Sequence, residues 1–89
     1  MTDITADGTA SLPNIGKRLA GKLASVGITT AGELRAAGSE AAFVRLKSRY
    51  PGVCLVCLYA LEGAISGTEY NRLPEDVKLR LKTFNADLG

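Results

Sequence analysis

Hydrophobic residues recur at helical spacing along this chain of 89 residues, and no stretch alternates between apolar and polar positions as a strand does. The clearest stripe lies in residues 16–26, where Leu19, Leu23 and Val26 share one face and charged side chains take the opposite face. Gly27 follows, and glycine is the residue type that most often ends a helix in the left-handed conformation. The pattern therefore predicts a helix over residues 16–26.

Two further helices are predicted in the next part of the chain. Thr30 and Glu33 have the spacing of a capping box, which predicts a short helix over residues 31–37. Ser39 is expected to cap a third helix over residues 40–50, because a Pro-Gly pair follows that stretch and ends it.

The second half of the chain begins with the most apolar segment. Residues 53–65 are apolar nearly all round, which predicts a central helix buried by the others. The one charge in this helix, Glu62, is expected to form a structural ion pair, because a lone buried carboxylate is costly. Pro74 suits the start of a last helix. The inward stripe of that helix is Leu73, Val77, Leu81 and Phe84.

These elements predict an all-α fold, a compact bundle of about five short helices. The length suits one domain, which we expect over residues 12–85, with residues 1–11 as a flexible arm and residues 86–89 as a frayed tail. No apolar run approaches the ~20 residues of a membrane span, and the N-terminus lacks the features of a signal peptide. We therefore expect a cytoplasmic protein that does not enter a membrane.

The charge of the chain is unevenly distributed. The net charge is only +2, but residues 12–50 carry seven Lys or Arg and two Glu, a local charge of +5. Such a concentration favours a polyanionic partner for this half of the molecule. The alternative is a solvated helix face whose lysines and arginines serve solubility.

The turn LPNIG, which precedes the first helix, is the main candidate functional site. Asn14 and Gly16 are residue types that accept positive φ, so the chain is expected to reverse sharply there. A turn of this pattern before a basic helix is how helix-hairpin-helix modules present backbone N–H groups to a nucleic-acid phosphate. The predicted nucleic-acid-binding residues are Asn14, Gly16, Lys17, Arg18 and Lys22. The alternative is a turn selected for its geometry alone.

Cys54 and Cys57 form a C-x-x-C motif. A thioredoxin-like dithiol needs this motif at a helix N-terminus after a strand, and no βαβ pattern surrounds it. A structural zinc site needs a second cysteine pair or histidines, and the chain has neither. We therefore expect two reduced thiols packed in the core.

The chain contains no His, and no nucleophile–base pair or metal-ligand set can be assembled from it. We therefore expect no catalytic activity, no metal, no cofactor and no small-molecule substrate.

Five motifs follow one another over roughly residues 11–84: LPNIG, VGITTAGELRAAG, AFVRLK, CLYALEGAISG and YNRLP. This order resembles the C-terminal domain of the TfoX/Sxy competence regulators. The resemblance implies an all-helical domain linked to the control of natural transformation and to DNA contact. Family members usually carry another domain in front, and only about eleven residues precede the match here. The chain thus looks like the helical domain standing alone.

Two functions are therefore expected from the sequence. The first is an accessory module in transcription and competence regulation, with weak, non-specific contact to duplex DNA through the LPNIG turn. The alternative is a protein–protein interaction domain, which binds another regulator or a second copy of itself and does not bind nucleic acid.

Overall fold

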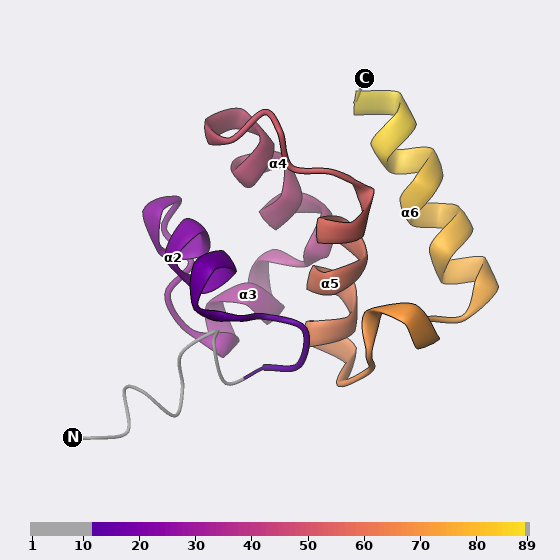
Figure 1. Ribbon diagram of the computed structural model, residues 1–89, viewed down its shortest axis with the longest axis horizontal. Coiled ribbons are helices and arrows are strands. Elements are labelled where there is room, and N and C mark those ends of the chain that lie inside the picture. Colours follow the sequence, from indigo (N-terminus) through magenta and orange to yellow (C-terminus); the bar gives the residue numbers. More distant parts are fainter. Residues whose placement is uncertain (1–11, 89) are drawn as a thin grey trace.

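Five α-helices and one 3-10 turn make up residues 12–88, the part of the chain that the computed structural model describes (Figure 1). The prediction of an all-α fold is confirmed. The expected arm over residues 1–11 lies outside the described residues. The elements are α2 (Lys17–Ser25), α3 (Ala31–Ala37), α4 (Ser39–Arg49), α5 (Leu55–Ser66), η2 (Tyr70–Arg72) and α6 (Glu75–Leu88).

The end of α2 follows the sequence prediction. Gly27 has a φ of +90°, and its N–H donates to the carbonyl of Ala24 at 3.1 Å. The N–H of Ile28 reaches back to the carbonyl of Leu23 at 2.9 Å, and the Ile28 side chain is buried. These bonds satisfy carbonyls that the helix itself leaves free at its end. The chain can therefore turn towards α3 without exposing Ile28.

The predicted capping box of α3 is confirmed. The hydroxyl of Thr30 accepts the N–H of Glu33 at 3.0 Å, and the Glu33 carboxylate accepts the N–H of Thr30 at 3.2 Å. Thr29 donates to the same carboxylate through its N–H at 2.7 Å and its hydroxyl at 2.8 Å. These bonds, those from Thr29 first, lower the pKa of Glu33 below its ordinary value of 4.5.

The start of α4 differs from the prediction. Ser39 is the first residue of the helix and does not cap it, because Gly38 takes the N-cap position with a φ of +86°. The Ser39 side chain is buried, and its hydroxyl donates to the carboxylate of Glu62 at 2.6 Å. The serine therefore joins α4 to α5.

α5 is the central helix, as predicted, and it contacts α3, α4, η2 and α6. In Figure 1, α5 lies between α2 and α6. The largest fully buried side chains of the described residues are Leu23, Ile28, Leu34, Phe43, Leu46, Leu58, Leu61 and Leu81. The first turn of α5 is only partly covered, because Val56 is 53% exposed while Leu55 and Cys57 are half-buried.

α6 uses the predicted apolar stripe to pack on the bundle. Leu73 and Leu81 are buried, and Val77 and Phe84 are half-buried against the same core. The helix continues to Leu88, beyond the end at Asn85 that the sequence predicts. None of the helices in residues 12–88 is long and apolar enough to cross a membrane.

Candidate nucleic-acid interface

Asn14 fixes the turn before α2 to a distant loop. Its backbone is left-handed, with a φ of +69°, as the sequence predicts. Its side-chain amide donates to the carbonyl of Thr68 at 2.9 Å and to that of Ala60 at 3.4 Å. Its side-chain oxygen accepts the N–H of Tyr70 at 3.1 Å. The polar atoms of the Asn14 side chain therefore bond to the backbone of its own chain, which indicates a structural role.

This junction depends on Gly63 of α5, a residue that sequence reasoning missed. A Cβ at this position would overlap both the carbonyl oxygen of Thr68 and the amide of Asn14. The sequence signal is a glycine within an otherwise strong helical stretch, which often marks close backbone approach. The turn and the loop thus meet because position 63 has no side chain.

Gly16 is the N-cap of α2, and its conformation corrects the prediction of positive φ. The residue has φ −89° and ψ −177°, an extended conformation that any residue adopts. Asn14 alone supplies the left-handed step of this turn. The expectation of a positive φ at Gly16 is therefore wrong.

Among the described residues, no side chain caps the backbone donors at the start of α2. The first bond of the helix runs from the N–H of Ala20 to the carbonyl of Gly16 at 2.9 Å. The N–H groups of residues 17–19 precede that bond and have no intrahelical partner. Gly16 has no side chain to cap them, and no side-chain capping bond is formed within the described residues.

The predicted cations divide into two groups. Lys17 and Arg18 lie at the start of α2 and are exposed. Lys22 is half-buried, and its Nζ lies 5.2 Å from the centroid of the Tyr50 ring, beyond the end of α4. Two of the three predicted cations are therefore exposed at the start of α2, and the third is engaged by an aromatic ring.

The contacts of Lys22 belong to a polar cluster that the sequence did not predict. The guanidinium of Arg49 lies 5.8 Å from the Tyr50 centroid, and the hydroxyls of Ser25 and Tyr50 share a hydrogen bond of 2.9 Å. Ser25 first, then Arg49 and Lys22, lower the pKa of the Tyr50 hydroxyl. The two helix ends are joined at the surface by this cluster.

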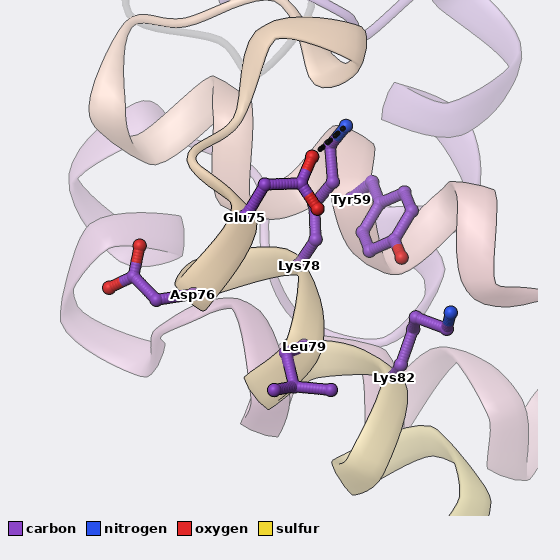
Figure 2. Close-up of a pocket in the computed structure, with 6 residues that line it drawn as sticks. All are labelled: Tyr59, Glu75, Asp76, Lys78, Leu79 and Lys82. Carbon is purple, nitrogen blue, oxygen red and sulfur yellow. Dashed lines mark ion pairs between the residues drawn. The ribbon is translucent and has the colours of Figure 1, made fainter.

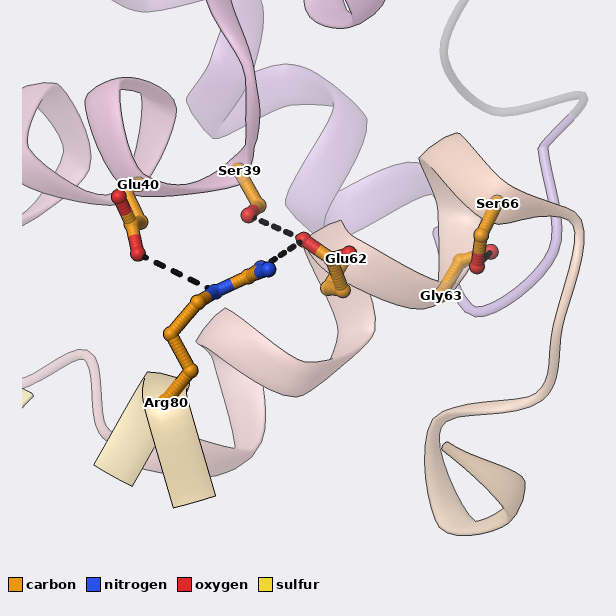
Figure 3. Close-up of polar contacts among 6 residues, drawn as sticks. All are labelled: Ser39, Glu40, Glu62, Gly63, Ser66 and Arg80. Atoms are coloured by element: carbon orange, nitrogen blue, oxygen red, sulfur yellow. Dashed lines mark hydrogen bonds and ion pairs between the residues drawn. The ribbon is translucent and has the colours of Figure 1, made fainter. Parts of the chain in front are cut away.

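Glu62 forms the structural ion pair that the sequence predicts. Its carboxylate lies 3.1 Å from a terminal nitrogen of Arg80 and also accepts the Ser39 hydroxyl (Figure 3). The Nε of Arg80 lies 3.5 Å from Glu40. One guanidinium thus bridges α4, α5 and α6, which indicates a structural junction. Within residues 12–88, no group of three or more His, Cys, Asp or Glu side chains is placed to hold a metal ion.

The cysteines differ from the prediction. Both are free thiols, but Cys54 is exposed and only Cys57 is partly buried. The reason is the helix boundary: α5 begins at Leu55, so Cys54 is its N-cap and lies outside the packed part of the helix. Burial raises the pKa of the Cys57 thiol. The expectation of two packed core thiols is therefore wrong for Cys54.

A shallow pocket lies between α5 and α6 (Figure 2). Leu79 is 65% exposed beside it, and the ion pair of Lys78 with Glu75, at 3.7 Å, lies at one end. The pocket is lined by Tyr59, Glu75, Asp76, Lys78, Leu79 and Lys82. Single apolar side chains of this kind are normal at a protein surface.

Comparisons with known proteins agree with this architecture. The model of the TfoX C-terminal domain family matches residues 5–84. An uncharacterized protein from Listeria monocytogenes, in a triclinic crystal form, is 43% identical with a TM-score of 0.89, and the match covers 91% of this chain and 92% of that chain. A protein of unknown function from the same organism, in a tetragonal form, is 43% identical with a TM-score of 0.88, covering 91% and 99%. No curated protein matches the chain.

Proposed function

We propose that this chain, which belongs to the TfoX C-terminal domain family, is an accessory regulatory module in transcription and competence control. In this proposal the module makes weak, sequence-independent contact with duplex DNA through the start of α2. The observation that carries the proposal is the exposed, uncapped helix start at Gly16, with Lys17 and Arg18 beside it.

The chemistry of this helix start suits a phosphate group. Unpaired N–H groups at a helix N-terminus point at an incoming anion, and the helix dipole adds a partial positive charge. In this proposal, the exposed Lys17 and Arg18 neutralise phosphates of the same strand. These contacts reach only the sugar-phosphate backbone, so they position DNA without selecting a sequence.

The position of Lys22 changes the expected salt dependence. Three phosphate contacts would give a slope of log affinity against log salt of about −2.7, and two would give about −1.8. Because the Lys22 ammonium lies over Tyr50, we expect a slope near the smaller magnitude. The dissociation constant should be about 10⁻⁴ to 10⁻⁶ M at physiological salt.

The test is a fluorescence-anisotropy titration of short duplex DNA at several salt concentrations. Lys17→Ala and Arg18→Ala should each flatten the slope by about 0.9, and Lys22→Ala by less. The matched control is Lys82→Ala, which removes the same charge from exposed α6 and should leave the slope unchanged. If the folded wild-type protein does not bind at low salt, or if Lys82→Ala acts like Lys17→Ala, the proposal fails.

A second candidate function, self-association, is favoured by the pocket between α5 and α6. Leu79 is exposed beside this pocket, with acidic Glu75 one turn before it and basic Lys82 nearly one turn after it (Figure 2). In an antiparallel pair of α6 helices, Glu75 of one copy would face Lys82 of the other, and the leucines would meet at the centre. The charge pattern is therefore self-complementary.

Sedimentation velocity over a range of protein concentrations tests this second function. Leu79→Asp should shift the wild-type dimer to monomer. Glu75→Lys and Lys82→Glu should each weaken the dimer, and the double variant should restore it, because the opposite charges meet again. A wild-type protein that stays monomeric at its highest soluble concentration contradicts the candidate.

A further inference from the structure

The C-x-x-C motif at the start of α5 is used by neither proposed function. Cys54 is the N-cap of the helix, with extended backbone angles of φ −125° and ψ −179°, and Cys57 is the third helical residue. The N–H of Cys57 donates to the carbonyl of Cys54 at 2.8 Å, so one hydrogen-bonded turn joins the two residues. Such a turn holds its end Cα atoms within about 7 Å, and disulfides span Cα separations of about 4.4–6.8 Å.

The two thiols differ in exposure. Cys54 is exposed, and Cys57 is partly buried against the hydrophobic core. Burial first, and then the neighbouring Cys54, raise the pKa of the Cys57 thiol, while the positive charge of Lys22 opposes them. Thiol–disulfide exchange needs an accessible sulfur that attacks and benefits from a second, shielded sulfur that completes the reaction. Cys54 supplies the accessible sulfur, and Cys57 supplies the shielded one.

From the hydrogen-bonded turn and the unequal exposure, we infer that Cys54 and Cys57 are a redox-active dithiol that closes a disulfide across the first turn of α5. The co-reactant is a low-molecular-weight disulfide, the oxidised form of a small thiol. This inference does not rest on DNA binding or on self-association. The proposed disulfide exchange does not require the strand and helix of a thioredoxin-like fold.

The exchange has two steps that balance. The Cys54 thiolate attacks one sulfur of the small disulfide, whose S–S bond breaks and releases one small thiolate. The Cys57 thiol then loses its proton, and its sulfur attacks the Cys54 sulfur and releases the second small thiolate. The two released thiolates take up the two protons. The protein dithiol is oxidised by two electrons, and the small disulfide is reduced to two thiols.

The test incubates the full native chain in glutathione buffers of increasing oxidised fraction and measures the intact mass after acid quenching. Wild-type protein should lose about 2 Da, the mass of two hydrogens, without a persistent glutathione adduct. C57S should retain one glutathione adduct on Cys54, because no second thiol displaces it. C54S should react at least about tenfold more slowly, because only the shielded thiol remains.

A second measurement keeps the inference testable if a serine variant unfolds. Alkylation of the native wild-type protein by iodoacetamide, followed by peptide mass analysis, should modify Cys54 at least about tenfold faster than Cys57. Two outcomes would overturn the inference. One is a wild-type protein that accumulates glutathione adducts or intermolecular disulfides without the loss of two hydrogens. The other is equal reactivity of the two thiols in the folded chain.

Discussion

The starts of α2 and α3 have similar backbone geometry but satisfy their backbone donors differently. Gly16 and Thr30, the two N-caps, are both extended. At α3, Thr30 and Glu33 pair with each other's N–H groups, and Thr29 adds two more bonds to the carboxylate. At α2, no side chain of the described residues forms a cap. One helix start is closed by its own side chains, and the other has no side-chain cap among the described residues.

α2 is held by packing more than by capping. A glycine N-cap costs only about a few tenths of a kcal/mol relative to a capping side chain, and α2 forms without such a side chain. Its inward face supplies the compensation, because Leu23 is fully buried and Leu19 and Val26 pack on the core. Burial of a leucine side chain contributes about 1.5–3 kcal/mol, more than a cap. α2 is therefore positioned mainly by packing, which allows its N-terminus to stay uncapped.

The largest expected effect is the loss of that packing. Leu23→Ala should lower the free energy of unfolding by about 2–5 kcal/mol, because it leaves a cavity under α2. Urea denaturation followed by circular dichroism measures it. Val56→Ala truncates an exposed side chain outside the proposed α6 contact and is the control, with an expected change within about 0.5 kcal/mol. Equal losses in the two variants would show that α2 is not held by packing.

The next effect is the loss of the cap at α3. Thr30→Ala should lower the free energy of unfolding by about 1 kcal/mol, because the N–H of Glu33 loses its hydroxyl acceptor. Thr30→Ser, which keeps the hydroxyl, should recover most of the stability. The same urea series measures both variants. A larger loss for Thr30→Ala than for Leu23→Ala would contradict the ranking of packing above capping.

A smaller effect is expected from pH. The pKa of Glu33 is lowered in the folded state, so the contribution of its carboxylate is present above the unfolded value of 4.5 and is lost as pH falls through the folded value. Urea midpoints measured from about pH 6 down to pH 3 should fall more for the wild-type protein than for Glu33→Gln, which has no carboxylate to protonate. Parallel curves would mean that the carboxylate does not stabilise the start of α3.

Local signals in the sequence predicted the stop after α2 and both ends of α3. The capping box at Thr30 and Glu33 and the stop at Gly27 each depend on residues a few positions apart. The residue type at Gly16 was less informative, because glycine adopts negative φ as readily as positive φ. Gly16 is extended in the structure, and Asn14 adopts the left-handed conformation.

The rest of the candidate site depends on contacts between distant parts of the chain. The Asn14 amide meets Thr68, and Lys22 meets Tyr50, only after the helices have packed. No spacing within one helix predicts these pairs. The exposure of Cys54 was missed for a related reason, since an apolar run of 53–65 does not reveal that the helix begins at Leu55. Tertiary packing, which sequence periodicity does not encode, decided the two contacts, and the helix boundary decided the exposure of Cys54.

The smallest expected effect on stability comes from closing the start of α2. Gly16 has the extended backbone that an N-cap aspartate adopts, and a Cβ there meets no atom within 4 Å. In Gly16→Asp, the carboxylate can accept the N–H groups of residues 18 and 19, so the free energy of unfolding should rise by about 0.5 kcal/mol. The same carboxylate would occupy the position of the phosphate and repel the DNA backbone, so binding should be lost.

Gly16→Asp could lose DNA binding because it caps the N–H groups or because its charge repels the phosphates. Gly16→Asn separates these two causes, because it caps the same N–H groups without a negative charge. It should raise stability to a similar extent and weaken DNA binding less than Gly16→Asp does. Urea denaturation and the anisotropy titration, run on the same preparations, measure both properties. If Gly16→Asp is more stable and still binds DNA as the wild-type protein does, the phosphate does not sit at the start of α2, and the open helix start only reflects how well α2 is packed.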